Sequence, residues 1–242
     1  IQDNFQKIDI KSLNIKELPE LERYILHKIF TLDLNYKENL KNYNFHKLYK
    51  ELLNFCTLDL SSFYFDIRKD VLYCDSINSK KRKNCIIVLN ILLDCLLKWF
   101  APILVFTTEE IYNLVEKSET SIHEMDLPKL KSEFQDIILE KKWKNLYKIK
   151  QEANVAIEEK RSTKEIGSSL EADIEIYTNE ENYKLLEKLD LTEYFITSKA
   201  KLLKNSDNKQ ETIINVKKTN GQKCPRCWKI LEFECKRCAE FI

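Results

Sequence analysis

Residues 85–100 read Cys-Ile-Ile-Val-Leu-Asn-Ile-Leu-Leu-Asp-Cys-Leu-Leu-Lys-Trp-Phe, and Pro102 follows two residues later. The apolar side chains recur at steps of three and four residues, at Cys85, Leu89, Leu92, Leu96 and Phe100. That spacing places them on one face of an α-helix, and a proline cannot continue the helix. The stretch therefore predicts a long amphipathic helix that ends near Phe100.

The same spacing recurs on both sides of this helix. The further positions are Leu18, Leu21, Ile25, Ile29 and Leu32, then Phe63, Ile67 and Val71, and later Leu139, Trp143, Leu146, Ile149, Ala153 and Ile157. Several helices, each with one apolar face, bury those faces against one another. The first two thirds of the chain are thus predicted to form a helical bundle, and the fold class is mainly α.

The pattern changes after Gly167. Residues 172–177 alternate between apolar and polar as a strand does, residues 194–198 and 213–216 are two further candidate strands, and residues 180–189 are a candidate helix. The polar residues 204–211 are predicted to be a linker or an exposed turn. We therefore expect a helical domain over 1–165, a small α+β module over 166–215 and a metal-binding knob over 216–242.

The knob is predicted from two Cys-x-x-Cys pairs, Cys224–Cys227 and Cys235–Cys238, with seven residues between them. Each pair presents two thiolates on one tight turn, and four thiolates complete a tetrahedral zinc shell. Such a shell leaves no open position for a substrate, so we expect one structural Zn²⁺ and no catalytic metal. The tail is too short to bury a core, so the metal is expected to supply its folding energy.

Basic and aromatic residues surround the ligands, which favours a nucleic-acid contact over catalysis. Trp228 is either the small core of the knob or an exposed surface on which an unpaired base stacks, and spacing alone does not separate the two. Arg226 lies between the first two ligands. The run Lys80, Lys81, Arg82 and Lys83 is either a solvated helix start or a contact to phosphates.

Composition excludes several other classes of protein. The chain has 242 residues with a net charge of +1, so any attraction to a charged partner has to be local. It has only two glycines, which excludes a glycine-rich phosphate loop. Polar residues interrupt the most apolar stretch, so we expect no membrane contact, and the cysteine usage is typical of a reducing cytoplasm. The three histidines form no recognisable catalytic constellation. Because the chain begins at Ile1, we expect it to be part of a longer protein.

The chain resembles the helical anticodon-binding domain of class I aminoacyl-tRNA synthetases. The resemblance lies in residues 43–46 (Tyr-Asn-Phe-His), 60–66 (Leu-Ser-Ser-Phe-Tyr-Phe-Asp), 69–73 (Lys-Asp-Val-Leu-Tyr) and 97–111. Residues 155–161, residues 164–172 and the tail Cys-Pro-Arg-Cys-Trp are similar to the isoleucyl members in particular. The gap between the two cysteine pairs is shorter than in those members.

The resemblance implies a set of roles. The full enzyme would ligate isoleucine to its tRNA with ATP, and its catalytic and editing domains are absent here, so this part alone is expected to be no enzyme. It would recognise the anticodon stem-loop of the tRNA for isoleucine, as a monomer in the cytoplasm. The zinc ligands carry over to Cys224, Cys227, Cys235 and Cys238, and the tail tryptophan to Trp228. ATP would bind only to the absent catalytic domain.

Two alternatives stay open. The first is a zinc-stapled helical module that binds protein, against which the basic residues of the knob argue. The second is the equivalent part of a valyl or leucyl synthetase, against which the zinc pairs of the tail argue.

Overall fold

The structure is a computed structural model, and it describes residues 13–116, 119–205 and 212–239. The chain divides into two compact units, the first made of 1–68 and 76–137 and the second of 69–75 and 138–242. The predicted domain boundaries at residues 165 and 215 stay a prediction beside this division. Within the described residues, no helix is sufficiently long and apolar to cross a bilayer.

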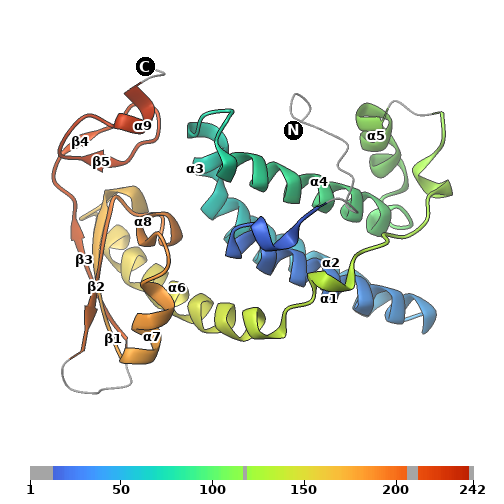
Figure 1. Ribbon diagram of the computed structural model, residues 1–242, viewed down its shortest axis with the longest axis horizontal. Coiled ribbons are helices and arrows are strands. Elements are labelled where there is room, and N and C mark those ends of the chain that lie inside the picture. The colour runs from blue at the N-terminus through green and yellow to red at the C-terminus, as the bar shows by residue number, and fades with distance from the viewer. Residues whose placement is uncertain (1–12, 117–118, 206–211, 240–242) are drawn as a thin grey trace. The chain divides into compact units, whose positions relative to one another are not determined.

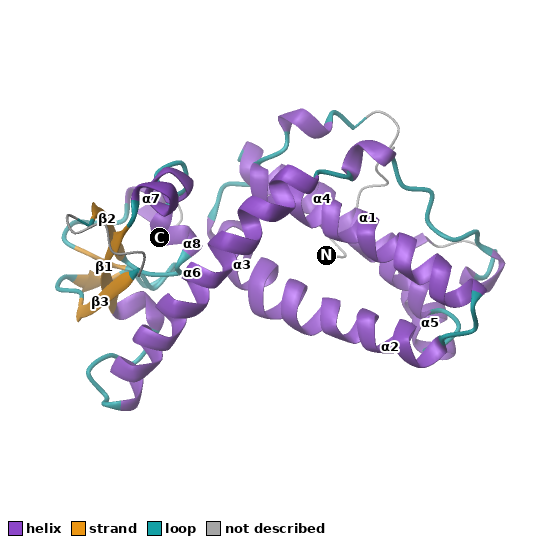
Figure 2. Cartoon of the chain, turned by 90° about the horizontal axis from the view of Figure 1, so that it is seen from below, coloured by secondary structure: helices purple, strands orange, loops and turns teal. Residues whose placement is uncertain are grey.

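The first unit is a bundle of helices (Figures 1 and 2). Its elements are α1 (Glu20–Lys41), α2 (Phe45–Asn54), a π-helical segment (Phe55–Phe65), the start of α3 (Asp66–Cys74), α4 (Lys80–Phe100) and α5 (Val105–Glu116). Short 3₁₀ turns lie at Ile15–Glu17, Ile122–Glu124 and Ser132–Phe134. Helix α1 packs against both α2 and α4, which makes it the centre of the bundle.

The apolar positions predicted between Leu18 and Leu32, in and just before α1, are all buried. So are Phe63 of the π-helical segment and Ile67 and Val71 of α3, and these predicted buried faces are confirmed. Helix α4 ends at Phe100 as predicted. Its buried face, however, is turned from the predicted one. Leu89, Leu96 and Phe100 are only half-buried, and the buried side chains include Val88, Ile91 and Trp99. The helix is apolar nearly all round, so its spacing does not single out one face.

The second unit contains a three-stranded sheet and the metal-binding knob that follows it in the chain. Its elements are α6 (Ile137–Ser162, from Ile138 on), a 3₁₀ turn (Ser169–Glu171), β1 (Ala172–Thr178), α7 (Glu180–Leu186), α8 (Leu191–Tyr194), β2 (Lys199–Lys204), β3 (Ile213–Lys218), β4 (Gln222–Lys223), β5 (Ile230–Leu231) and α9 (Lys236–Ala239). The strand order is β2-β1-β3, with β2 parallel and β3 antiparallel to β1. Helices α6, α7 and α8 lie on one side of this sheet (Figures 1 and 2).

The strands follow from alternation, with one exception. β1 buries every second residue, from Ala172 to Thr178, and β3 contains the predicted strand 213–216. The strand predicted at 194–198 is wrong, because Tyr194 ends α8 and the second strand begins at Lys199. Tyr194 and Phe195 instead pack edge to face, and Tyr194 also packs edge to face against Trp143 of α6. Most of the predicted linker, at 206–211, lies outside the described residues.

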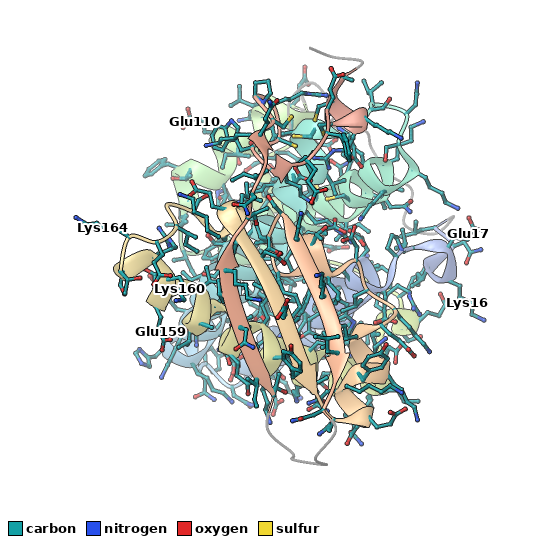
Figure 3. The ribbon with its side chains drawn as sticks, turned by 90° about the vertical axis from the view of Figure 1, so that its left-hand side faces the viewer. Lys16, Glu17, Glu110, Glu159, Lys160 and Lys164 are labelled. Atoms are coloured by element: carbon teal, nitrogen blue, oxygen red, sulfur yellow. The ribbon has the colours of Figure 1, made fainter. Side chains whose placement is uncertain are left out.

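Helix α6 presents opposite properties on its two faces. Its six predicted apolar positions are all buried, and on the other face Lys141, Lys144 and Lys148 are exposed. Glu159, Lys160 and Lys164 project outward around its C-terminal end (Figure 3). Lys150 is buried, however, and donates to the carbonyl of Tyr194 at 2.6 Å, a role that its charge did not indicate.

Candidate metal centre

The structure brings the four tail cysteines together. The Sγ atoms of Cys224, Cys227, Cys235 and Cys238 all lie within 4.8 Å of one another. A tetrahedron with metal–sulfur bonds of about 2.3 Å has edges of about 3.8 Å. The Sγ atoms of Cys227 and Cys235, one from each pair, are 3.8 Å apart. The donor set thus has the size and composition that one four-thiolate metal ion requires.

A tight hairpin presents the first pair. β4 and β5 are antiparallel, and between them the N–H of Trp228 donates to the carbonyl of Cys224 at 3.0 Å. Gly221 begins the hairpin at φ +141°, where a Cβ atom would lie 2.4 Å from the carbonyl oxygen of Leu231. Only glycine fits such a close approach at positive φ. The first ligand turn therefore depends on one of the two glycines in the chain.

The second pair lies at the start of the short helix α9. The N–H of Cys238 donates to the carbonyl of Cys235 at 2.9 Å, which closes the turn that carries both sulfurs. Cys238 is fully buried and Cys235 is half-buried. The seven residues between the pairs suffice to bring the two turns face to face, although the gap is short.

The thiols of the centre have unequal acidities. Burial and the adjacent thiols raise the pKa of Cys238 to about 12. Burial also opposes ionisation of Cys224, but the backbone N–H groups of Cys227 and Arg226 outweigh it and lower that pKa to about 7. Four thiolates at this spacing repel one another, and a divalent cation among them removes that repulsion. The chemistry of the donor set therefore fits a structural metal ion.

Trp228 is an exposed side chain rather than a small core. Its side chain is 60% exposed, and its backbone has φ +62°, a left-handed conformation that is unusual for a bulky residue. The ammonium of Lys223 lies 5.6 Å from the centre of the indole ring. The metal-binding turn thus holds an aromatic face towards solvent, beside a positive charge.

Arg226 has a structural contact that the sequence did not predict. Its Nη2 donates to the backbone carbonyl of Tyr73 at 3.2 Å, within the second unit. Cys74, next in the chain, is buried against the ligand cysteines, with its Sγ 4.0 Å from the carbonyl of Arg226. The apolar sequence surroundings of Cys56, Cys74, Cys85 and Cys95 predict four small buried hydrophobic residues. Cys85 and Cys95 are buried in the bundle, Cys56 is half-buried, and Cys74 belongs to the surroundings of the metal centre.

The basic run Lys80–Lys83 forms the first turn of α4 in the first unit. Ser79 caps this helix by accepting from the N–H of Arg82 at 3.3 Å. A helix N-terminus carries partial positive charge, so cations there cost about 0.3–1 kcal/mol each, and anions are attracted. Lys80 and Lys83 are exposed, and Lys81 and Arg82 are half-buried. The four basic side chains therefore add positive charge at the N-terminal end of α4, where cations destabilise a helix and attract anions.

The sequence did not identify the residues that bond the knob to the rest of the second unit. They are Arg237, which pairs with Asp70, and Ser198, which bonds the N–H of Ile230. In the sequence, Arg237 is only one of several basic residues near the four cysteines. No periodicity or spacing connects residues that are more than 150 positions apart, such as Asp70 and Arg237, so only the folded structure identifies the pair.

The comparisons with known proteins agree with this architecture. Residues 22–176 match the family described as the anticodon-binding domain of tRNA ligase. The chain is 55% identical to an isoleucine–tRNA ligase of Pelagibacter ubique over 98% of its own length and 26% of that protein. It is 34% identical to the isoleucine–tRNA ligases of Agrobacterium fabrum, over 88% of its length, and Brachyspira hyodysenteriae, over 96%.

The chain spans about a quarter of the length of these relatives, 26%, 23% and 27% of them respectively. The resemblance to isoleucyl enzymes that the sequence motifs indicated is confirmed. More than half of the chain lies within the matched family. With its helical bundle and cysteine centre, the chain belongs to the family of anticodon-binding domains of tRNA ligases.

Proposed function

We propose that this chain recognises the anticodon stem-loop of the tRNA for isoleucine, as part of a cytoplasmic enzyme that ligates isoleucine to that tRNA with ATP. Its relatives are isoleucine–tRNA ligases, which supports this assignment. The chain on its own would bind tRNA and would not catalyse the ligation, because that reaction would belong to the rest of the enzyme.

The observation that carries the proposal is the exposed indole of Trp228. Unpaired anticodon bases can stack on an aromatic face, and each such contact contributes about 1–3 kcal/mol. An exposed tryptophan held by a left-handed backbone has no evident role in the stability of the knob. Lys223 beside the ring would meet a phosphate of the same loop.

We propose one Zn²⁺ at Cys224, Cys227, Cys235 and Cys238. These ligands suit zinc because four soft thiolates favour it and leave no open coordination position. The ion would hold the two ligand turns together, and its role would be structural. The first turn of α4, with Lys80, Lys81, Arg82 and Lys83, would contact phosphates. Arg226 would also contact a phosphate, through the part of its guanidinium that does not bond to Tyr73.

The test compares Trp228→Ala with Phe233→Ala in an anisotropy assay with labelled tRNA. Phe233 is also an exposed aromatic residue of the knob, at 84%, but it lies between Glu232 and Glu234. Loss of a stacking contact should weaken binding by Trp228→Ala roughly 5- to 150-fold. Phe233→Ala should change binding little, because two carboxylates disfavour an approaching phosphate. Equal affinity of Trp228→Ala and the unchanged chain would overturn the proposal.

The rival function, a module that binds protein, predicts a different dependence on salt. Each phosphate contact releases counterions, so RNA affinity should fall steeply with salt concentration. A shallow dependence, together with indifference to a changed anticodon, would favour the rival.

A further inference from the structure

The second ligand turn is tied to a distant segment of the second unit. Nη1 and Nη2 of Arg237 lie 2.5 Å and 2.9 Å from the two carboxylate oxygens of Asp70. Nη1 also lies 3.4 Å from Oδ1 of Asp75. A bidentate arginine–carboxylate pair fixes direction as well as distance. One guanidinium thus holds the turn of Cys235 and Cys238 against the segment 69–75.

The first ligand turn contacts the same segment. Arg226 donates to the carbonyl of Tyr73 at 3.2 Å, and Cys74 is buried among the ligand cysteines. Tyr73 and Cys74 form the C-terminal end of α3, where carbonyl groups without helical partners attract cations. The arginine at the third position of each Cys-x-x-Cys motif therefore contacts residues 69–75.

On its other side the knob is fastened to the α+β part of the second unit. The N–H of Ile230 donates to Oγ of Ser198 at 2.6 Å, and Nζ of Lys229 donates to Oγ1 of Thr192 at 3.2 Å. Lys199 forms an ion pair with Glu232. The two cysteine pairs thus lie between the segment 69–75 and the α+β part of the second unit. A metal ion that joins the two pairs would also join these two parts.

We propose that Arg237 is a positioning residue for RNA recognition, and that its pair with Asp70 makes the metal knob a clamp between residues 69–75 and the α+β part. The clamp holds the indole of Trp228 in one orientation. This inference rests on the proposed function for its RNA consequence, although the clamp itself does not need RNA. Charge alone would assign Arg237 to a phosphate, but Asp70 and Asp75 occupy its guanidinium.

The two roles of Arg237 predict opposite effects of Asp70→Asn on tRNA binding. Removing a negative charge beside a phosphate-binding arginine would leave binding unchanged or tighten it. Removing the anchor of a positioning arginine lets the knob move, so binding should weaken by about 5-fold or more, the lower end of typical coupling between linked sites. Unchanged or tighter binding of Asp70→Asn would overturn the proposal.

Two further comparisons separate position from charge. Arg237→Gln and Lys236→Gln each remove one positive charge from the same ligand turn, and Lys236 is exposed. Arg237→Gln should weaken binding as Asp70→Asn does, and Lys236→Gln by no more than about 2-fold. The double variant with Arg237→Asp and Asp70→Arg restores the pair in reverse and should recover most of the affinity. Equal losses for Lys236→Gln and Arg237→Gln would contradict the clamp.

Hydrogen exchange of the full chain tests the clamp without RNA. With the metal content measured and unchanged, Arg237→Gln and Asp70→Asn should each speed exchange in both 69–75 and 235–239. Arg237→Lys, which keeps the charge and loses the bidentate geometry, should do so to a smaller extent. Unchanged exchange in all three variants would refute the clamp. Faster exchange together with an unaffected Trp228→Ala would retain the clamp and reject the proposed function.

Discussion

The hydroxyl of Ser198 joins the hairpin of the metal centre to the sheet, because it accepts from the N–H of Ile230 at 2.6 Å and donates to the carbonyl of Leu170 at 2.5 Å. Ser198 is buried, and so is Ile230. Residue 198 directly precedes β2, so the strand and the hairpin share one hydrogen-bonded connection. Within the second unit, this connection joins the first ligand turn to the three-stranded sheet.

We therefore expect Ser198→Ala to destabilise the second unit. The substitution leaves the buried N–H of Ile230 and the carbonyl of the half-buried Leu170 without this partner, which costs about 1–3 kcal/mol. Denaturant unfolding at saturating metal measures the loss. Ser162→Ala is the control, because Ser162 is exposed and its hydroxyl bonds only the carbonyl of Glu159 at 2.8 Å. A similar small change in both variants would contradict the role of Ser198.

Removing Glu22 should destabilise the bundle strongly. Nε and Nη2 of Arg68 lie 2.6 Å and 2.7 Å from its two carboxylate oxygens, and both side chains are buried. Glu22→Ala leaves the charge of Arg68 buried without its counterion, which costs about 3–5 kcal/mol. Asp126→Ala breaks a solvent-exposed pair with Lys129 and should destabilise the fold far less. Thermal or denaturant unfolding distinguishes the two, and a cost for Glu22→Ala as small as that of the control would refute the prediction.

Removal of metal should unfold the knob and leave the helices of the bundle intact. Between residues 219 and 239 the regular structure consists of two two-residue strands and one short helix, so the stability of the knob should depend on the ion. We expect a chelator to release one zinc ion per chain, to change the fluorescence of Trp228 and to expose 224–239 to protease, with little loss of helical circular dichroism. Cys224→Ser should reproduce this result and Cys95→Ser, in the bundle, should not. A tail that stays resistant to protease after chelation would contradict it.

Glu109 should titrate at lower pH than an ordinary glutamate. The hydroxyl of Ser121 donates to its carboxylate at 2.8 Å and the N–H of Ile122 donates at 3.0 Å. The Ser121 bond is the largest influence, and together these bonds outweigh desolvation and lower the pKa of Glu109. A folded-state pKa below the unfolded one stabilises the fold above the unfolded value, and that contribution disappears as the pH falls through the folded value.

An NMR titration of the Glu109 carboxyl checks this expectation. Ser121→Ala should move the pKa of Glu109 back towards its ordinary value. Glu180, whose pKa is lowered chiefly by its bond to Lys204, should not respond to that substitution. An unchanged Glu109 titration in Ser121→Ala would show that the Ser121 bond is not the cause.

Periodicity predicted the helices better than it predicted their packing. For α1 every predicted position is buried, but so are Glu22, Tyr24, Leu26 and His27, so the buried surface of this helix extends well beyond the predicted face. In α4 apolar residues surround most of the helix, and the contact of Tyr36 with Trp99 helps to select the buried side. The strand expected at 194–198 failed for a related reason, since a short apolar run has no period of its own.

By itself the sequence determined the helical class, the four cysteines of the candidate metal centre and the family, because these depend on residue types at short spacings along one chain. Only the tertiary structure decided which side of α4 is buried, that Trp228 is exposed, and that Arg237 pairs with Asp70. Hydrogen bonds and ion pairs of this kind join residues whose separation along the chain is more than 150 positions, as with Asp70 and Arg237, and local patterns carry no information about such partners.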